Sequence, residues 1–322
     1  MGVNNIGKIH CRYYSQNPDV KLVAACDLIE ERARAMADLY GCKVYTDMKE
    51  MLRNEEIDIV SIATSGEENG GDHFEPAIMA IEAGKDVLVE KPISNNIEEA
   101  REMVRLAAEK NVRLASNLNH RFVPAAYKGK ELIDKGELGT LLYLNMKLTI
   151  QNPKETSPWF HLRALHPHSI DVLRYFAGDI RRVQSFMTKA PGRNIWSTAS
   201  INLEFASGAV GDIESSRNSP YGFDSGCEII GTEGAIQIPT IRDQELTVLD
   251  IKGTHDLGTI FPSSLSQAFA TEINAFIQAV LEGKATLCTE HDGVAALQIA
   301  VAADKSFKTN SQIELDKETV LN

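Results

Sequence analysis

Small residues at the start of the chain have the spacing of a dinucleotide-binding turn. In the first ten residues, MGVNNIGKIH, the pattern G-x-G-x-x-G places Gly2, Asn4 and Gly7 at its three positions. The first glycine of such a turn permits a tight bend, the second lets the backbone approach a pyrophosphate, and the third lets helix and strand pack closely. The helix that follows donates backbone N–H groups to the phosphates. Asn4 tolerates left-handed backbone but adds a side chain, so this pattern alone is a weak signal.

Asp27 strengthens the prediction of a dinucleotide site. It ends the apolar run VKLVAACD at residues 20–27, about the distance downstream at which a carboxylate bonds the ribose 2′-hydroxyl. A carboxylate there repels a 2′-phosphate, so NAD is favoured over NADP. The alternative is an ordinary loop-to-helix cap beside an unrelated surface aspartate.

A buried strand should lead into this turn, and none precedes Gly2. The first strand of such a sheet is central, so losing about five or six apolar side chains at ~1.5–3 kcal/mol each removes around 10 kcal/mol. That is comparable to the whole stability of a domain, about 5–15 kcal/mol. We therefore expect Met1 to be a misplaced start, with a Val/Ile-rich strand upstream. If the chain is native as written, we expect a gap in the sheet beside the strand at 57–64 and weakened cofactor binding.

Composition excludes several classes of function. The chain has 322 residues, enough for two domains, and a net charge of −12 that argues against binding to a phosphate backbone. Its five cysteines are far apart and form no C-x-x-C pair, so neither a disulfide framework nor a zinc ribbon is indicated. No segment approaches the roughly twenty apolar residues of a membrane helix, and the N-terminus lacks a signal-peptide pattern. We expect a soluble, cytoplasmic protein.

The first third of the chain predicts a Rossmann-type domain over residues 1–120. Apolar runs of strand length lie at 20–27, 57–64, 86–92 and 112–118. Helical patterns lie between them at 29–41, 73–84 and 96–111, the last with Asn96 and Glu99 in a capping-box arrangement. Strands that alternate with helices indicate right-handed crossovers and a parallel sheet covered on both faces.

Residues 121–322 predict an α+β domain with an open antiparallel sheet, so the whole chain is α/β plus α+β. A helix at 124–139 precedes runs with strand alternation at 141–150, 181–189, 197–205, 209–215, 227–231, 235–239 and 246–250. Helices return at 266–283 and 290–308, before a short strand at 312–316. We expect helices on one face of this sheet. A free face rich in strand apolars tends to be covered by a partner, which predicts a homodimer or homotetramer.

The most specific motif is VLVEKPIS at 87–94, an E-K-P sequence after an apolar strand, combined with H-x-x-D (His168 and Asp171) at the head of a later helix. Together these motifs resemble the glucose-fructose oxidoreductase / inositol dehydrogenase family (Gfo/Idh/MocA). The resemblance extends over nearly the whole chain from Gly2. Its other matching stretches are ACD at 25–27, SIAT at 61–64, HFEPAIMAIEAG at 73–84, NHRFVPA at 119–125, HSIDVLRYFAGD at 168–179 and FIQAVLEGKA at 276–285.

The resemblance implies a nicotinamide-dependent oxidoreductase that acts on a sugar, polyol or related secondary alcohol. Lys91 matches the family's E-K-P lysine and His168 its catalytic histidine. Hydride leaves the carbinol carbon while the hydroxyl proton goes to a base. A lysine serves as that base if desolvation or a neighbouring cation lowers its pKa, and oxidised nicotinamide is such a cation. The alternatives are a surface lysine at a strand exit and a structural histidine.

The resemblance also implies binding residues. Those expected at the cofactor are Gly2, Asn4, Ile6, Gly7, Asp27, Thr64, His73, Glu90, Lys91 and Asn119. Those expected at the substrate are Trp159, Arg163, His166, Asp171 and Tyr221. Three of these have open alternatives: Trp159 could anchor its loop, Tyr221 could pack on the sheet, and Asp171 could interact with the first turn of its own helix.

One position departs from the family. Inositol dehydrogenase-like members have an aspartate four residues before the histidine, where this chain has Ala164. The proton work then falls to Lys91 with His168, alone or with His166 assisting. Arg163 and His166 would suit a substrate that bears a carboxylate or phosphate, because arginine forms bidentate pairs with such groups.

Three histidines, His161, His166 and His168, raise the question of a metal. No cysteine or glutamate near them completes a ligand set, so we expect none. Two rival functions stay open. The cofactor could act as a transient oxidant in an elimination or epimerisation, or the protein could be a catalytically silent NAD-binding regulator.

Overall fold

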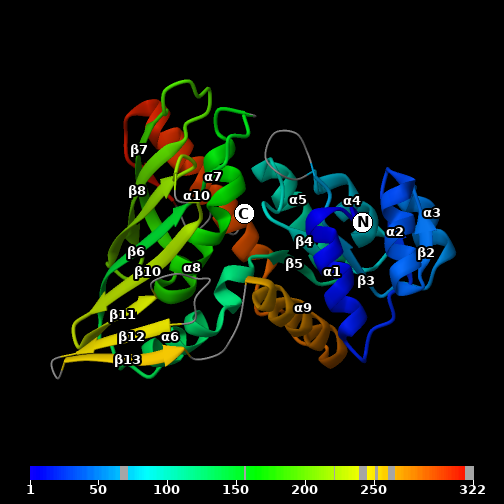
Figure 1. The fold of residues 1–322 in the computed structure, drawn as a ribbon, viewed down its shortest axis with the longest axis horizontal. Coiled ribbons are helices and arrows are strands. Elements are labelled where there is room, and N and C mark those ends of the chain that lie inside the picture. Colours follow the sequence, from blue (N-terminus) through cyan, green and yellow to red (C-terminus); the bar gives the residue numbers. More distant parts are fainter. Residues whose placement is uncertain are drawn as a thin grey trace. The chain divides into compact units, whose positions relative to one another are not determined.

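The computed structural model describes residues 1–65, 72–155, 157–220, 222–238, 245–250, 253–259 and 265–315. The chain divides into two compact units (Figure 1). The first contains Met1–Leu118 and Phe269–Val294, and the second contains Asn119–Ala268 and Ala295–Asn322. The first unit thus closes two residues before the expected boundary at 120. It also takes in a late segment that we had assigned to the second domain.

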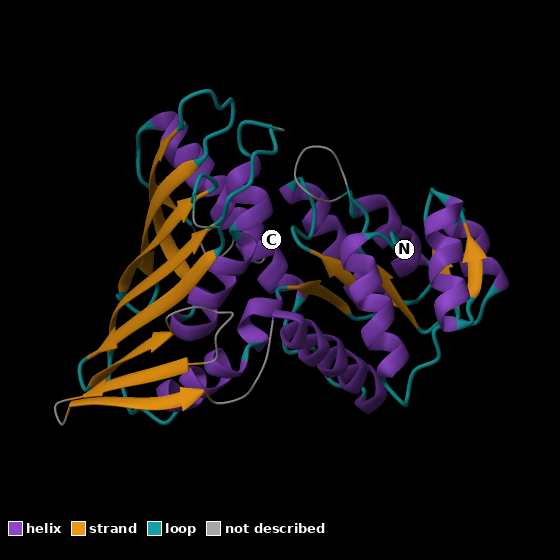
Figure 2. Ribbon diagram, viewed as in Figure 1, coloured by secondary structure: helices purple, strands orange, loops and turns teal. Residues whose placement is uncertain are grey.

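The first unit alternates strands and helices, as expected, and all its strand pairs are parallel. Its strands are β1 (Ala24–Cys26), β2 (Lys43–Tyr45), β3 (Ile59–Ile62), β4 (Asp86–Glu90) and β5 (Leu114–Asn117). Its helices are α1 (Asn5–Gln16), α2 (Glu30–Tyr40), α3 (Met48–Asn54), α4 (Phe74–Glu82), α5 (Ile97–Lys110) and most of α9 (Leu265–Glu282). The short elements β2 and α3 were not anticipated. Helices lie on both faces of the strands (Figure 2).

The predicted cap of α5 forms with one difference. The Asn96 side chain accepts a hydrogen bond from the Glu98 N–H at 2.8 Å. Glu99 does not reach back to Asn96, because its carboxylate accepts from the Ser94 hydroxyl at 2.5 Å. That hydroxyl in turn accepts from the Asn96 N–H at 3.1 Å. The reciprocal half of the capping box therefore runs through Ser94.

The sheet of the first unit has a gap. β1 pairs with β2 in a two-stranded sheet, and β3, β4 and β5 form a separate three-stranded sheet. A cavity of about 610 Å³ is lined by the segments on both sides of this gap. The expectation of a gap beside the strand at 57–64 is confirmed.

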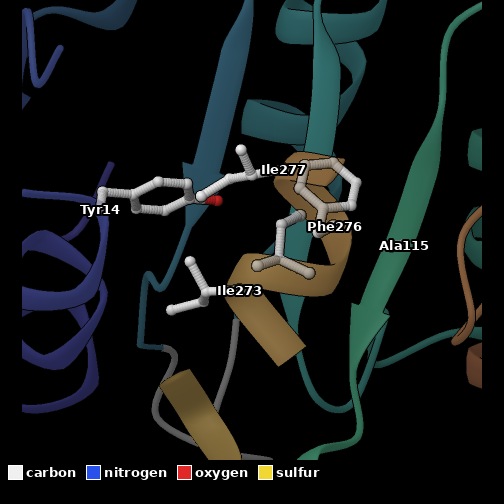
Figure 3. Packing of buried hydrophobic residues seen from close by; sticks show 6 residues of the cluster. Tyr14, Ala115, Ile273, Phe276 and Ile277 are labelled. Carbon is white, nitrogen blue, oxygen red and sulfur yellow. The ribbon is translucent and has the colours of Figure 1, made fainter. Parts of the chain in front are cut away.

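The late segment joins the first unit through its apolar face. In α9, Ile273, Phe276 and Ile277 are buried in one cluster with Tyr14 of α1 and Leu88 of β4 (Figure 3). α9 therefore covers strands that precede it by more than 150 residues. Since a sheet face must be buried against another element to be stable, the unit is completed only when this helix returns.

The second unit contains a nine-stranded sheet in the order β13-β12-β11-β10-β6-β9-β8-β7-β14. Its strands are β6 (Leu141–Thr149), β7 (Ile180–Thr188), β8 (Thr198–Phe205), β9 (Val210–Ser216), β10 (Asp224–Gly231), β11 (Gly234–Ile238), β12 (Glu245–Asp250), β13 (Gly253–Thr259) and β14 (Ile313–Glu314). Its helices are η1 (Asn119–Phe122), α6 (Pro124–Asp134), α7 (Phe160–Leu165), α8 (Pro167–Ala177) and α10 (Glu290–Thr309). The strands expected from alternation are present, with β13 in addition.

Two features of this sheet differ from expectation. β6 and β9 pair in parallel, so the sheet is mixed although the other pairs are antiparallel. Along β6, Leu144 and Met146 are buried on the face that packs against α8. The opposite face is not rich in apolar residues as we expected, since Tyr143 and Asn145 there donate hydrogen bonds to Asp212.

Among the described residues, the helices are too short or too polar to span a membrane.

Candidate cofactor and active site

The backbone at Gly2 and Gly7 lies as close to neighbouring backbone as these glycines predict. Gly2 has a φ of +74° and its N–H donates to the Cys26 carbonyl at 2.9 Å. A Cβ placed on Gly7 would lie 1.9 Å from the Gly2 carbonyl oxygen, and a Cβ on Gly2 would lie 2.7 Å from the Ala63 backbone. Only glycine fits at either position. Asn5 also has a positive φ, of +32°, whereas Asn4 is extended.

The N-terminus of α1 suits a phosphate group. Asn4 is the N-cap of this twelve-residue helix, but its side chain makes no capping hydrogen bond, and the first turn has no acidic residue. Ile6 is half-buried in that turn. Free N–H groups and a helix dipole without an acidic side chain nearby favour an anion. The residues present therefore fit the pyrophosphate of a dinucleotide.

Asp27 joins the turn to the end of β1. It is 6% exposed, and its two carboxylate oxygens accept from the Val3 N–H at 2.9 Å and the Ile29 N–H at 3.0 Å. Each carboxylate oxygen has a second lone pair, so the group can also accept from a ribose hydroxyl. Asp27 thus has a structural role beside the predicted one.

Lys91 leaves the carboxyl end of β4, where its backbone is held by a buried histidine network. The Lys91 N–H donates to Glu90 Oε2 at 3.2 Å. Glu90 Oε1 lies 3.3 Å from His10 Nε2, and His10 Nδ1 lies 2.6 Å from the Ser61 hydroxyl. His10 Nε2 also lies 3.0 Å from the Asn117 amide nitrogen. One imidazole from α1 thus links the ends of β3, β4 and β5.

His73, which we predicted to line the cofactor cleft, supports the residue after Lys91. It is 1% exposed, and its ring nitrogens lie 2.7 Å from the Pro92 carbonyl and 3.0 Å from the Thr64 carbonyl. Burial lowers the pKa of His73, so the ring is neutral at pH 7 and donates to one of the two. The Lys91–Pro92 peptide is cis, and His73 connects it to the loop that carries Thr64. The Thr64 hydroxyl itself donates to the Asp72 carbonyl.

In the second unit, His168 lies in the first turn of α8 with its ring stacked on another histidine. The centroids of the His168 and His120 rings are 4.1 Å apart and the planes differ by 9°. Two positive charges at this separation repel each other. The stack therefore disfavours a positive charge on both rings at once. Asn119, at the start of η1, is 1% exposed, and neither amide atom has a hydrogen-bond partner among the described residues.

Asp171 is held away from solvent, which corrects its assignment to the substrate. It is fully buried and forms a bidentate pair with Arg121, from Nε to Oδ2 at 2.8 Å and from Nη2 to Oδ1. This ion pair ties η1 to α8. The spacing of His168 and Asp171 correctly places both on one helix, but the carboxylate serves the fold.

Both residues of the predicted anion-binding pair bond to side chains of the second unit. His166 is fully buried, with Nδ1 3.1 Å from the Ser169 hydroxyl and Nε2 hydrogen-bonded to Ser215. Desolvation lowers its pKa to about 3, so the ring stays neutral. Arg163 Nε lies 3.2 Å from Asp304 Oδ2, although burial outweighs that attraction and raises the pKa of Asp304 to about 7. The buried, neutral His166 does not suit a substrate anion, whereas the Arg163 side chain is 23% exposed.

His161 and His166 share one serine and do not converge with His168. Their Nε2 atoms both bond the Ser215 hydroxyl, and their ring centroids are 5.0 Å apart. Within the described ranges, no group of three or more His, Cys, Asp or Glu side chains could hold a metal ion.

Trp159 packs against other side chains of the second unit. Its ring centroid lies 6.2 Å from that of Trp196 and 6.5 Å from that of Phe307, and Lys308 Nζ lies 3.8 Å from its ring. Tyr221 lies outside the described residues.

Several residues in this region were not predicted from the sequence. His10, His120 and Ser215 join the predicted residues in buried contacts. Arg217, 2% exposed, lies over the Phe160 ring at 4.3 Å, and among the described side chains none bonds its Nε or Nη2. Of these residues, only His10 could have been found from the sequence, because it is a polar residue on the face of α1 that buries Gly7, Cys11 and Tyr14.

The chain is similar to known proteins over nearly its whole length. Residues 1–118 match the family described as "Oxidoreductase family, NAD-binding Rossmann fold", and residues 128–237 match the "GFO/IDH/MocA C-terminal domain". A scyllo-inositol 2-dehydrogenase (NAD(+)) of Bacillus subtilis is 31% identical over 98% of this chain and 95% of its own. An inositol 2-dehydrogenase of Rhizobium meliloti is 28% identical over 98% of both.

A solved structure has the same fold over the same extent. It is described as a putative myo-inositol dehydrogenase from Sinorhizobium meliloti 1021, and it matches with a TM-score of 0.84 and 26% identity over 98% of each chain.

The role of the glycine turn in binding NAD can be tested by adding a single methyl group at Gly7. Gly7→Ala places a Cβ against the Gly2 carbonyl, so α1 must shift and its N–H groups leave the phosphates. We expect NAD affinity to fall at least tenfold, measured by calorimetry. Gly129→Ala is the matched control, since its Cβ would make ordinary van der Waals contacts with Phe176 at 3.5 Å and Ile236 at 3.8 Å. Unchanged NAD affinity in a folded Gly7→Ala protein would contradict the assignment of the turn.

Buried His166 should make the second unit sensitive to acid. Its folded pKa of about 3 lies below the unfolded value of 6.5. The unfolded chain therefore binds the proton more tightly, and stability is complete above pH 6.5 and lost as the pH falls toward 3. We expect a loss of about 2 kcal/mol between pH 8 and pH 5 from this group. Urea unfolding at both pH values measures it.

The matched variants separate this effect from general acid sensitivity. His166→Asn should reduce the pH dependence, whatever it does to stability at pH 8. His291→Asn, at an exposed position of α10, should leave the dependence unchanged. Equal pH dependence in wild type and His166→Asn would show that this histidine is not buried in its neutral form.

Proposed function

The chain belongs to the Gfo/Idh/MocA family of oxidoreductases with an NAD-binding Rossmann domain, and from this premise we propose that it is an NAD-dependent dehydrogenase of CH–OH donors. Its substrate, in this proposal, is a secondary alcohol of an inositol, a sugar or a sugar derivative. The names of relatives that match 98% of the chain support this substrate class. The observation that carries the proposal is Lys91, whose backbone at the exit of β4 is held by Glu90 and His10.

The first unit supplies the groups that a dinucleotide requires. The Gly2–Gly7 turn and the uncapped start of α1 would hold the pyrophosphate, and Asp27 would accept a ribose hydroxyl. The Asp27 carboxylate favours NAD, because a 2′-phosphate beside it would meet a like charge. When bound, oxidised nicotinamide accepts hydride from the carbinol carbon.

The protein's own residues must accept and return the hydroxyl proton. As hydride leaves the carbinol carbon, the hydroxyl proton must pass to a base. We assign this role to Lys91 Nζ, which as a free amine accepts the proton and as an ammonium returns it in the reverse direction. For the second unit, we assign His168 to binding a substrate hydroxyl, with its ring plane fixed by stacking on His120.

His10, Glu90 and His73 are positioning residues in this scheme. His10 and Glu90 hold the Lys91 N–H, and His73 holds the Pro92 carbonyl. Displacement of a reacting group by about 1 Å can cost 10²-fold in rate. These buried contacts therefore contribute to turnover although none of them touches the substrate.

Two other functions differ from this one in what they produce. An enzyme that uses NAD as a transient oxidant restores it within each turnover, so no NADH accumulates. A catalytically silent regulator binds NAD without turnover, and Ala164 in place of the family's aspartate is the feature that favours it. We also propose assembly as a homodimer or homotetramer through the sheet of the second unit.

The assignment of Lys91 predicts a loss of turnover without a loss of cofactor. In a screen of inositols, aldoses and sugar acids with NAD and NADP, we expect net NADH from at least one polyol or sugar. Lys91→Met should then lower kcat by about 10²- to 10⁴-fold with NAD affinity unchanged. Lys110→Met, at the exposed end of α5, is the control. NAD binding without NADH on every substrate would support the regulator instead.

A further inference from the structure

Arg217, in the second unit, buries a guanidinium edge that no described group bonds. The residue follows β9 and is 2% exposed, and its Nε and Nη2 atoms have no hydrogen-bond partner in the part of the chain that the structure describes. Its Cζ lies 4.3 Å from the centroid of the Phe160 ring. A ring face attracts a cation but does not supply the lone pairs that N–H groups require. Since a charge without hydrogen bonds is costly to bury, this edge needs an acceptor.

Arg217 keeps its positive charge at neutral pH. Desolvation, followed by repulsion from Arg193, lowers its pKa to about 10, so the side chain is still protonated at pH 7. Glu155 attracts it, but Glu155 Oε1 already accepts from Arg193 Nε. Glu155 Oε2 accepts from two backbone N–H groups, at 3.0 Å each. Within the described ranges, the charge on Arg217 therefore has no bonded counter-ion.

Another arginine of the second unit shows what this edge of a guanidinium binds. Arg121 donates from Nε and Nη2 to the two carboxylate oxygens of Asp171. The two N–H groups of that edge are parallel and match the spacing of carboxylate oxygens. On Arg217, Nε and Nη2 are the same two atoms, and no described group bonds them. The edge of Arg217 therefore suits a planar carboxylate.

Ser219 supplies a neutral hydroxyl next to this cation. It is 4% exposed, and its Oγ has no hydrogen-bond partner among the residues that the structure describes. Its Cα is at most about 7 Å from that of Arg217, because two residues separate them by no more than this. A ligand of a few atoms can therefore bond both side chains. One positive charge and one neutral hydroxyl match a carboxylate beside a hydroxyl better than a phosphate, whose charge is about −1.5 to −2.

Contacts within the second unit connect this segment to the start of α8. Ser215 precedes Arg217 by two residues, and its hydroxyl bonds His166 Nε2. His166 is the N-cap of α8, and His168 lies in the first turn of that helix. The segment with Arg217 thus contacts the end of the helix that carries His168, to which we assign a substrate hydroxyl.

We propose that Arg217 and Ser219 bind a sugar acid, with Arg217 bidentate to the carboxylate and Ser219 bonded to a neighbouring hydroxyl. This inference rests on the proposed function, because it makes the sugar acid the secondary alcohol that is oxidised. Oxidation converts one CH–OH of the acid to C=O, with the hydride on NAD and the hydroxyl proton released, and the carboxylate is unchanged. A neutral inositol or aldose leaves the Arg217 edge without an acceptor, so it is the poorer substrate.

The test compares ligands that differ by one charge. D-glucuronate, D-galacturonate and D-gluconate are each paired with the corresponding amide, which has the same hydroxyls and no charge. With NAD present, we expect calorimetry to show at least one acid binding about 10- to 100-fold more tightly than its amide. The same acid should give NADH with the higher kcat/KM.

Variants of Arg217 assign the preference to this side chain. Arg217→Met should abolish the preference for the acid, and the protein should still fold because an apolar chain of similar length replaces a buried charge. Arg217→Lys keeps the charge without the bidentate edge and should weaken the acid by at least about tenfold. Arg181→Met is the matched control, since the Arg181 side chain is 50% exposed and paired with Glu204.

Three outcomes would overturn the proposal. The wild-type protein could bind every acid no more tightly than its amide, a result that does not depend on any variant. The preference for an acid could persist in folded Arg217→Met. Glucose 6-phosphate could bind while all three acids fail, which would assign the site to a phosphate.

NADH production distinguishes this inference from the proposed function. Acid binding that depends on Arg217, without NADH from any substrate, would leave the carboxylate site standing and contradict the dehydrogenase. NADH from a neutral polyol, with kcat/KM unchanged in Arg217→Met, would confirm the dehydrogenase and contradict the sugar acid.

Discussion

The start of α1 is fixed by the absence of a side chain at Gly7, and much of the first unit depends on that contact. A single methyl group there would lie 1.9 Å from the Gly2 carbonyl, so the helix can begin this close to the sheet only at glycine. Three features follow from its place. Its N-terminus starts at the glycine turn with no acidic residue in its first turn, His10 reaches the ends of three strands, and Tyr14 meets α9. The cofactor turn and the support of Lys91 are therefore consequences of one backbone approach.

In the second unit, buried charge and polarity hold the helices at the site. Arg121 and Asp171 form a fully desolvated pair that fixes η1 against α8. Removing one partner of such a pair typically costs about 3–5 kcal/mol, because the other is left buried and uncompensated. The neutral Ser215 hydroxyl also fixes buried side chains in this unit, because it bonds both His161 and His166. His168 lies in the first turn of α8, where its ring stacks on that of His120.

The first unit consists of two separate stretches of the chain, and the burial of apolar surface explains why. Its sheet is split between β1 and β3, so the two halves are held by Met1, Gly2 and the covering helices instead of by a shared ladder. α9 adds Ile273, Phe276 and Ile277 to the core of the half that contains β4 and β5. A small domain buries little surface, so a helix contributed from a distant part of the chain matters more here than in a complete sheet.

The sequence alone determined the alternation of strands and helices, the glycine turn, the caps at Gly41 and Asn96, and the likeness that identifies Lys91 and His168. These features are local, because they depend on backbone conformation, period and spacing within a few residues. Tertiary structure decided which polar residues are buried and what they bond. Asp171, Arg163 and His166 have residue types suited to a substrate, yet Arg121, Asp304 and Ser215 engage them from 50, 141 and 49 residues away. Spacing along one helix cannot report a partner on another element, so the same carboxylate can serve a substrate or the fold until its neighbour is known.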